Sequence, residues 1–228
     1  MAIGIAVGTM SAQLKIAETY LTVQGEGSHA GLPCFFIRTA GCDLRCTWCD
    51  TPNALTTAGS RTLPIQEILE LVPPETDLIQ ITGGEPMLQR AGIVELSNRL
   101  MEARPGRRIL LETGGHISLE GLPEGLHIVM DVKLPDSGEA DRDFSRNFAF
   151  LKRTDEIKFV VGGRADFDIA VDWINEYNLT GVCELLFSPV WGAADPRDLA
   201  GWLLESGLRA RMQVQLHKII WGADATGV

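Results

Sequence analysis

Short apolar runs, separated by segments with helical periodicity, constrain the fold of this chain more than any other feature. The runs are Cys34–Thr39, Leu78–Thr82, Arg108–Glu112, His127–Val132, Ile157–Val161 and Leu185–Ser188. Nearly continuous apolar runs of this length are typical of parallel strands that are covered on both faces of their sheet. We therefore expect a sheet of about six parallel strands.

Segments with helical spacing lie between these runs. Apolar side chains recur at i, i+3, i+4 and i+7 from Ile65 to Val72, and Pro73–Pro74 predicts the end of that helix. Further helices are predicted over residues 93–101, 167–174 and 199–203. Repeated strand-then-helix units favour right-handed crossovers in an open α/β sheet or a barrel. About six strands are too few for a complete eight-unit barrel.

Size and charge exclude several classes of protein. The 228 residues carry a net charge of −10, which argues against a broad nucleic-acid-binding face. No apolar run is long enough to span a membrane. Residues 1–11 are mildly apolar without the features of a signal peptide, so we expect a loose N-terminal extension. The rest of the chain has no strong linker, and we expect one domain over residues 1–228.

Three cysteines, Cys42, Cys46 and Cys49, stand close together with the spacing C-x3-C-x2-C. Three clustered thiolates can hold three irons of a cubane cluster and leave the fourth iron open to a substrate. A zinc knuckle needs a fourth ligand; Cys34 lies in a predicted strand and is a poor candidate, Cys183 is expected in another apolar strand as a core residue, and nothing in the spacing of His29 supports it. Five cysteines, an odd number, argue against a disulfide framework and for a reducing cytoplasm.

A glycine-rich motif, Thr82-Gly83-Gly84-Glu85-Pro86, follows the second predicted strand. Paired glycines allow the backbone to approach a ligand closely, and Glu85 can accept a hydrogen bond from a cationic amine. Alone the motif is weak, because plain strand-to-helix turns often have this composition. Together with the cysteines it lies at the carboxyl ends of strands, where α/β folds place their active sites.

These two motifs resemble those of the radical S-adenosylmethionine (SAM) superfamily, in which an aromatic residue, here Trp48, precedes the last cysteine. The resemblance implies a 4Fe–4S cluster on Cys42, Cys46 and Cys49, with SAM on the open iron. The stretches 21–27, 35–42 and 215–222 further resemble the 7-carboxy-7-deazaguanine synthase family, from about residue 17 to residue 228. That family has a short barrel of about six β/α units, which agrees with the strand count.

The resemblance also assigns a substrate site. Its members are Val23, Gln24, Gly25, Arg38, Thr82 and the terminal Val228. A guanidinium suits a substrate carboxylate, although Arg38 alone reads more simply as a surface ion pair. Thr51 matches a Mg²⁺ ligand, although a threonine there is more often a helix N-cap. From composition the tail 221–228 looks frayed, whereas in the family the chain end returns to the site.

Other residues match the cofactor site. They are Trp48, Gly84, Glu85, Asp131, Val132, Lys133, Ser188, Pro189, Val190 and Trp191. Asp131 and Val132 depart from the family's usual Ser-Pro before the retained Lys133, and several relatives have glutamine in place of Ser188. Glu112 ends a strand where relatives keep a glutamate near the reacting carbon, which suggests a catalytic role in proton handling or positioning. A capping network is the plainer alternative for this carboxylate.

The implied reaction contracts the ring of 6-carboxy-5,6,7,8-tetrahydropterin to give 7-carboxy-7-deazaguanine and ammonia, in queuosine-type deazapurine biosynthesis. The resemblance implies Mg²⁺, a flavodoxin or ferredoxin as reductant, and a homodimer in the cytoplasm. One alternative is an activating enzyme that makes a glycyl radical on a partner protein. Another is an iron–sulfur electron carrier, which needs four cysteine ligands and no glycine-rich cofactor loop.

Overall fold

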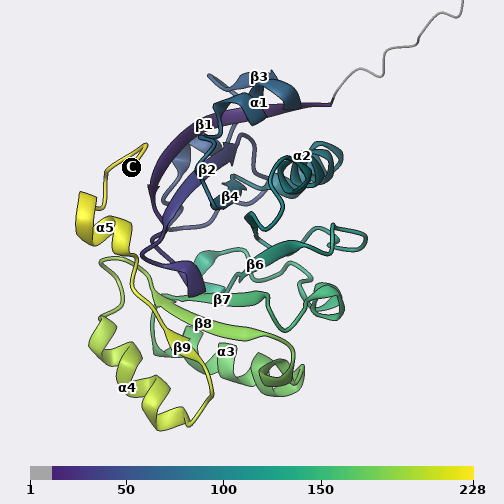
Figure 1. Cartoon of the computed structure of the whole chain (residues 1–228). Coiled ribbons are helices and arrows are strands. Elements are labelled where there is room, and N and C mark those ends of the chain that lie inside the picture. Colours follow the sequence, from purple (N-terminus) through teal and green to yellow (C-terminus); the bar gives the residue numbers. More distant parts are fainter. Residues whose placement is uncertain (1–11) are drawn as a thin grey trace, which may run out of the picture.

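A single curved sheet of nine strands forms the centre of the molecule in the computed structural model, which describes residues 12–228 (Figure 1). The predicted extension 1–11 lies outside the described residues. The strand order is β3-β1-β2-β4-β5-β6-β7-β8-β9. From β2 to β9 all neighbours run parallel, whereas β1 is antiparallel to both β2 and β3. The sheet forms an incomplete barrel, as the strand count predicted.

All six predicted strands are confirmed, and three others were missed. The strands are β1 (Gln13–Val23), β2 (Pro33–Thr39), β3 (Arg61–Pro64), β4 (Leu78–Gly83), β5 (Arg108–Thr113), β6 (Leu126–Val132), β7 (Glu156–Val161), β8 (Glu184–Pro189) and β9 (Arg211–Met212). Strand β1 escaped prediction because most of its residues are half-buried and mix polar with apolar side chains. Cys183 lies one residue before β8, half-buried against the core, rather than inside the strand.

The first four helices lie on the outer side of the curved sheet, whereas the last helix lies apart from them beside the chain end (Figure 1). They are α1 (Ile65–Leu71), α2 (Arg90–Ala103), α3 (Arg164–Glu176), α4 (Pro196–Ser206) and α5 (Leu216–Trp221). The first four confirm the periodicity, and α5 was not predicted. Residues 135–147, which follow β6, begin and end in short 3₁₀ turns. No helix of the described part of the chain is long and apolar enough to cross a membrane.

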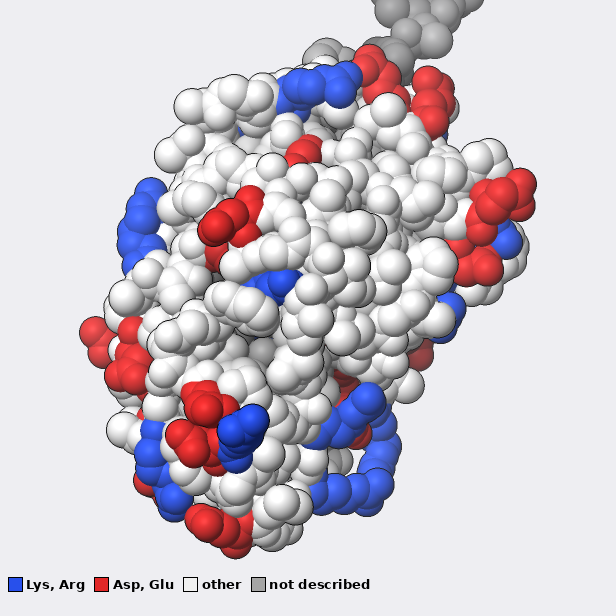
Figure 2. Space-filling view, turned by 90° about the vertical axis from the view of Figure 1, so that its left-hand side faces the viewer, with Lys and Arg blue, Asp and Glu red and all other residues white. Residues whose placement is uncertain are grey.

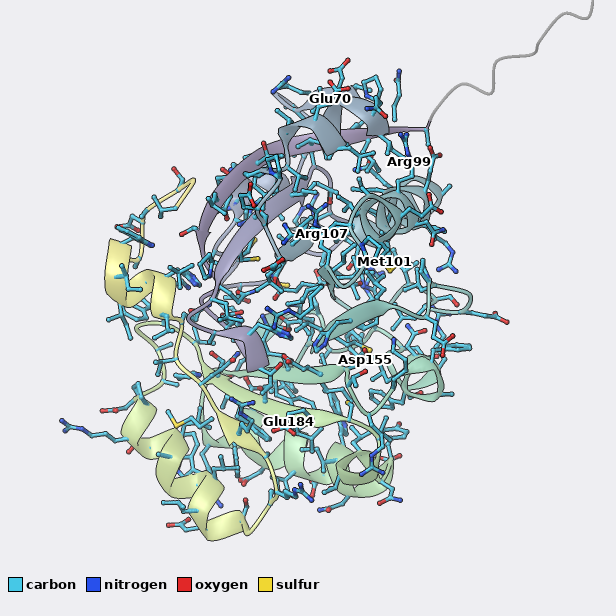
Figure 3. The ribbon with its side chains drawn as sticks, in the orientation of Figure 1. Glu70, Arg99, Met101, Arg107, Asp155 and Glu184 are labelled. Carbon is cyan, nitrogen blue, oxygen red and sulfur yellow. The ribbon has the colours of Figure 1, made fainter. Side chains whose placement is uncertain are left out.

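Two apolar clusters hold these layers together. The larger one joins the sheet to the outer helices, where the rings of Phe159 and Phe167 each lie against Phe187 with centroids 5.3 and 5.2 Å apart. Met101 of α2, labelled in Figure 3, packs against the same cluster. Burial of each such side chain contributes about 1.5–3 kcal/mol.

The smaller cluster lies inside the barrel. Its members are Cys34, Phe36, Leu78 and Leu110, with Tyr20 packed against them. The Tyr20 and Phe36 rings stack in parallel with centroids 5.2 Å apart. This cluster is the apolar floor of the barrel. Side chains alternate across a strand, so the next inward-facing residues lie two positions further on, above this floor.

Candidate active site

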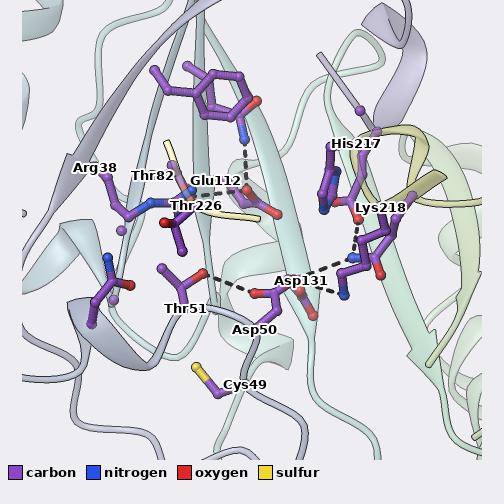
Figure 4. Close-up of a pocket in the computed structure, with 18 of the residues that line it drawn as sticks. Arg38, Cys49, Asp50, Thr51, Thr82, Glu112, Asp131, His217, Lys218 and Thr226 are labelled. Atoms are coloured by element: carbon purple, nitrogen blue, oxygen red, sulfur yellow. Dashed lines mark hydrogen bonds and ion pairs between the residues drawn. The ribbon is translucent and has the colours of Figure 1, made fainter. Parts of the chain in front are cut away.

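A cavity of about 420 Å³ opens above the floor, at the carboxyl ends of the parallel strands (Figure 4). It is lined by the cysteine loop, the glycine-rich loop, polar side chains of the barrel interior and the last residues of the chain. Distant parts of the sequence therefore meet at the end of the barrel where α/β folds place their sites. This location agrees with the expectation from the two motifs.

The cysteine loop follows β2, and all three of its cysteines line the cavity in half-buried positions. Hydrogen bonds hold it, from Gly41 N to Ala54 O at 2.8 Å and from Thr47 N to Ser137 O at 3.0 Å. The Leu44 amide donates to Cys42 Sγ at 3.4 Å. Burial raises the pKa of the Cys42 thiol. A cysteine becomes a metal-binding thiolate when the metal replaces its proton, and amide N–H donors stabilise the negative charge on the sulfur.

The spread of the three sulfurs fits a cluster better than a single ion. A group of at least three His, Cys, Asp or Glu side chains that could hold one metal ion has all its ligand atoms within 4.8 Å of one another. Among the described residues, the three cysteines do not form such a group, so at least two of their sulfurs are further apart than this limit. Thiolates around one tetrahedral zinc ion would lie about 3.8 Å apart, given Zn–S bonds of about 2.3 Å. The zinc alternative is therefore disfavoured, and the donor set fits the three-cysteine cluster.

The glycine-rich loop packs directly on the cysteine loop. Gly84 N donates to Thr39 O at 3.1 Å, and Glu85 N donates to Gly41 O at 2.9 Å. A Cβ added at Gly84 would lie 2.4 Å from the Gly41 carbonyl oxygen and 2.6 Å from that of Ala54. No side chain fits there, so the glycine is required by the approach of two backbones.

The Glu85 carboxylate serves the protein interior. Its side chain accepts hydrogen bonds from Met87 N at 2.9 Å, Thr113 Oγ1 at 2.7 Å and Gly114 N at 2.8 Å. The residue is 1% exposed, and burial raises its pKa. These contacts brace the loop and use both carboxylate oxygens, which disfavours the expected interaction of this side chain with a cofactor amine.

Lys158 lies at the centre of the cavity's charges. Its ammonium is 2.5 Å from Glu112, 2.9 Å from Glu26 and 3.2 Å from Asp131. Burial acts to lower the pKa of Lys158, but the three carboxylates raise it well above its ordinary value. Asp131 also pairs with Lys133 at 3.0 Å, and the pKa of Asp131 is lowered by these two cations against the effect of burial. The network links β5, β6, β7 and the loop after β1.

Glu112 is held from two further sides. Gln80 Nε2 donates to it at 2.7 Å and Thr82 Oγ1 at 3.1 Å. Gln80 in turn accepts from Gln24 of the predicted substrate stretch. Glu112 therefore takes part in an ionic and hydrogen-bonded network inside the barrel, and not in the helix-capping network that was the alternative.

Arg38 and Thr51 face the cavity from its other wall (Figure 4). Arg38 Nε lies 2.7 Å from Glu18, and its Nη2 donates to Tyr20 at 2.7 Å. This ion pair lies in the cavity wall and not on the outer surface. Thr51 precedes a 3₁₀ turn without capping it, and its hydroxyl donates to Asp50 at 3.0 Å.

The chain end covers the cavity. Residues 223–228, including Val228, line it together with side chains of α5, so the tail is not frayed. Lys218 lies 3.4 Å from Asp50, and Leu216 N donates to Gly25 O at 3.1 Å. Burial acts to raise the pKa of Asp50, but the ammonium groups of Lys218 and Lys158 lower it to about 2.

Most predicted site residues meet in this cavity, and three do not line it. Those that line it are Cys42, Cys46, Cys49, Thr51, Trp48, Gly84, Glu85, Asp131, Lys133, Val190, Trp191, Glu112, Val23, Gln24, Gly25, Arg38, Thr82 and Val228. The Val132 side chain belongs to the outer core, because its neighbour Asp131 takes the inward position. Ser188 and Pro189, at the end of β8, are buried outside the cavity lining.

The sequence analysis missed several residues of the cavity, above all Lys158, Glu26 and Asp50. Lys158 interrupts the apolar run Ile157–Val161, and Gln80 interrupts Leu78–Thr82 in the same way. A polar residue inside such a run is a signal that could have found both. Asp50 and Glu26 carry no comparable signal, because charged loop residues are common.

Comparisons with known proteins agree with this geometry. Residues 36–133 match the radical SAM superfamily. The chain is 39% identical over 221 residues to 7-carboxy-7-deazaguanine synthase of Chlorobaculum tepidum, covering 95% of this chain and 98% of that protein. The enzyme of the same name from Koribacter versatilis is 37% identical over 230 residues, covering 94% and 100%. QueE from Escherichia coli has the same fold, with a TM-score of 0.73 at 21% identity over 89% of this chain and 94% of that one.

Proposed function

This chain belongs to the 7-carboxy-7-deazaguanine synthase family of the radical SAM superfamily, and we propose on that premise that it converts 6-carboxy-5,6,7,8-tetrahydropterin into 7-carboxy-7-deazaguanine and ammonia. Atoms balance as a rearrangement with loss of ammonia. The observation that carries the proposal is one cavity that unites the cysteine loop with Arg38, the Glu112 network and the chain end. The deazaguanine product serves queuosine-type biosynthesis.

The three cysteines hold the 4Fe–4S cluster. When bound, the cluster and SAM supply a carbon-centred radical by reductive cleavage of the sulfonium. SAM would bind in the same cavity as the cysteine loop. Its proposed contacts among the lining residues are Trp48, Gly84, Lys133, Val190 and Trp191. The chain's own task there is to bind, orient and exclude water.

The barrel interior provides the substrate site. Arg38 binds the pterin carboxylate, since its Nη1 makes no hydrogen bond within the described residues. Gln24, Gly25 and Thr82 contact the heterocycle, and Glu112 holds or moves a proton at its reacting carbon. Lys158 and Gln80 fix the position of Glu112 through bonds of 2.5 and 2.7 Å. Positioned acids and bases contribute through such fixed geometry.

A Mg²⁺ ion belongs beside Thr51. Its hydroxyl and the adjacent Asp50 carboxylate form an oxygen donor pair next to Arg38 in the cavity lining. Mg²⁺ retains waters and takes few protein ligands, so this pair suits an ion that also holds the substrate carboxylate. The low pKa of Asp50 keeps that carboxylate charged at neutral pH.

The chain end favours a small substrate over a protein substrate. Residues 223–228 and α5 lie over the cavity, whereas a glycyl-radical activating enzyme needs an open barrel face for its partner chain. An electron carrier has no need of the substrate-type residues Arg38 and Gln24. The two alternatives from the sequence are therefore not favoured.

The electron donor and the oligomeric state complete the proposal. Arg45, within the cysteine loop, and Arg142, beside it, donate hydrogen bonds to carbonyl oxygens of the loop, and these two cations suit an acidic flavodoxin or ferredoxin although Glu139 pairs with Arg142. On the face of α5, charges of both signs lie scattered over a broad uncharged surface (Figure 2). Exposed Ile219, Ile220 and Trp221 lie on α5 and suit a homodimer contact. Free cysteines suit the reducing cytoplasm.

The test is an anaerobic assay with the reconstituted protein, SAM, a reductant and 6-carboxytetrahydropterin. We expect 7-carboxy-7-deazaguanine and ammonium in equal amounts by mass spectrometry, and no product from Cys46→Ala. Cleavage of SAM without turnover of the pterin would contradict the proposed substrate but not the superfamily. Light scattering of the same sample tests the homodimer.

A further inference from the structure

Two histidines and a glutamate meet at the end of the barrel opposite the cavity. Ligand atoms of His29, His127 and Glu156 all lie within 4.8 Å of one another. His29 ends the 3₁₀ turn Gly27–His29 in the loop between β1 and β2, while His127 and Glu156 stand at the starts of β6 and β7. None of the three lines the active-site cavity. The group is therefore separate from the site described above.

The group contains buried polar atoms without partners. Glu156 is 1% exposed, and its Oε1 accepts from Ser28 N at 2.9 Å and from the Ser28 hydroxyl. Within the described residues, Glu156 Oε2 has no hydrogen-bond partner, and His127 Nε2 has only the ion-pair contact with Glu156 Oε1 at 3.3 Å, which lacks hydrogen-bond geometry. Buried polar atoms are nearly always satisfied, so two unsatisfied ligand atoms side by side indicate a bound group.

The distances and donor types fit a zinc ion. His127 Nε2 lies 3.3 Å from Glu156 Oε1, close to the separation of about 3.4 Å between two donors on one tetrahedral zinc with bonds of about 2.0–2.1 Å. The His29 and His127 rings meet edge to face with centroids 5.1 Å apart. Two imidazoles and one carboxylate favour zinc over Mg²⁺ or Ca²⁺, which prefer oxygen donors alone.

The surroundings of the group suit a metal as well. A neutral imidazole is the form that binds metal. The Ser28 bonds to Glu156 also match the outer hydrogen bonds that orient metal-binding carboxylates.

We propose that His29, His127 and Glu156 bind a Zn²⁺ ion that fastens the β1–β2 loop to the far wall of the incomplete barrel. In the sheet, β4 and β5 separate β1 and β2 from β6 and β7. The β1–β2 loop nevertheless lies beside β7 (Figure 1). The same loop carries Glu26, which pairs with Lys158 at 2.9 Å. The ion would thus fix the segment that presents Gln24 to Glu26 in the cavity.

Gly27 leaves the Glu156 carboxylate room for this role. Its φ is +73°, and a Cβ there would lie 2.6 Å from Glu156 Oε2, the unpartnered oxygen. A side chain at this position would be strained and would crowd the oxygen. The loop therefore approaches the carboxylate as closely as a backbone can, without covering it.

The experiment uses the full chain with its cluster already reconstituted, to which ZnSO₄ is added before desalting. We expect one retained zinc per chain by elemental analysis, beyond the cluster iron. X-ray absorption should show nitrogen and oxygen ligands at about 2.0–2.2 Å and no sulfur shell at about 2.3 Å. His29→Ala, His127→Ala and Glu156→Gln should each weaken zinc binding at least about tenfold.

Glu184→Gln is the matched control. Glu184, labelled in Figure 3, pairs with Glu156 in the register of β7 and β8, but its side chain is exposed. That variant should retain zinc like the parent. Three results would overturn the proposal: no retained zinc, sulfur in the zinc shell, or equal retention by the three ligand variants. His29→Ala changes the most accessible ligand and so keeps the test valid if a deeper variant does not fold.

Discussion

Replacing Lys158 by methionine tests the charge network on which the cavity depends. The methionine keeps most of the side-chain volume but removes an ammonium that is 5% exposed and pairs with Glu26, Glu112 and Asp131. Three carboxylates then remain together without their shared cation. Removing one partner of a buried ion pair costs about 3–5 kcal/mol, since the remaining charge is left uncompensated.

This cost converts into a measurable change in melting temperature. An unfolding entropy of about 2.1 cal/mol/K per residue gives roughly 0.5 kcal/mol/K for 228 residues. A loss of about 3–5 kcal/mol should therefore lower Tm by about 6–10 °C. The assay is thermal and urea unfolding of anaerobic protein at neutral pH, followed by circular dichroism.

The loss should depend on pH with a defined sign. The pKa of Asp131 is lowered, so its contribution to stability is present above the unfolded-state pKa of about 3.9 and is lost as the pH falls through the folded-state pKa. Lys158 is one of the cations that lower it. The difference between variant and parent should thus be largest at neutral pH and shrink only as the pH falls below about 4.

Lys15→Met is the control, because Lys15 also lies in a strand but is exposed. Its effect should stay within about 0.5 kcal/mol. Adding Glu112→Gln to Lys158→Met should restore part of the lost stability. Two results would contradict this prediction: unfolding of Lys158→Met like the parent protein at pH 7, or a loss of stability that is the same at about pH 3 as at pH 7.

Three further predictions concern the proposed chemistry. Cys46→Ala should lose cluster absorbance and all activity while its circular dichroism stays native; full turnover by that variant would refute the cluster assignment. Arg38→Ala should chiefly raise KM in steady-state assays, the sign of lost uniform binding, and an unchanged KM would remove Arg38 from the substrate site. Deleting residues 224–228 should also raise KM while iron content stays unchanged, because the tail lines the cavity but supplies no cluster ligand; loss of iron would contradict this.

The sequence predicted the repeated strand–helix units of the fold well. It predicted the strands at the edges of the sheet and the last helix poorly. Parallel strands such as β4 and β5 are buried on both faces, so their apolar runs are visible in the sequence. By contrast, β1 is antiparallel to its neighbours and mixes polar with apolar residues, and α5 is short and has no buried face. Such elements depend on tertiary contacts that local patterns do not contain.

The candidate site shows the same division. Cysteine and glycine spacing predicts the two loops because their chemistry requires neighbouring residues. The partners of Glu112 come from β4 and β7, 30 to 46 residues away in the sequence, and only folding brings them together. The hydrogen bonds of the Glu85 side chain to Thr113 and Gly114 could not be predicted either, because they join the motif to the end of another strand.

The alternation of side chains along the strands places both the apolar floor of the barrel and the polar residues of the site above it. Phe36, Leu78 and Leu110 belong to the apolar floor, and two residues further along the same strands stand Arg38, Gln80 and Glu112. A slip of one residue in register would exchange these inward side chains for outward ones. Because the floor excludes water beneath the polar layer, the ion pairs above it act in a medium of low dielectric constant and hold their geometry more firmly. The strand register that buries the core is therefore the same property that assembles the site.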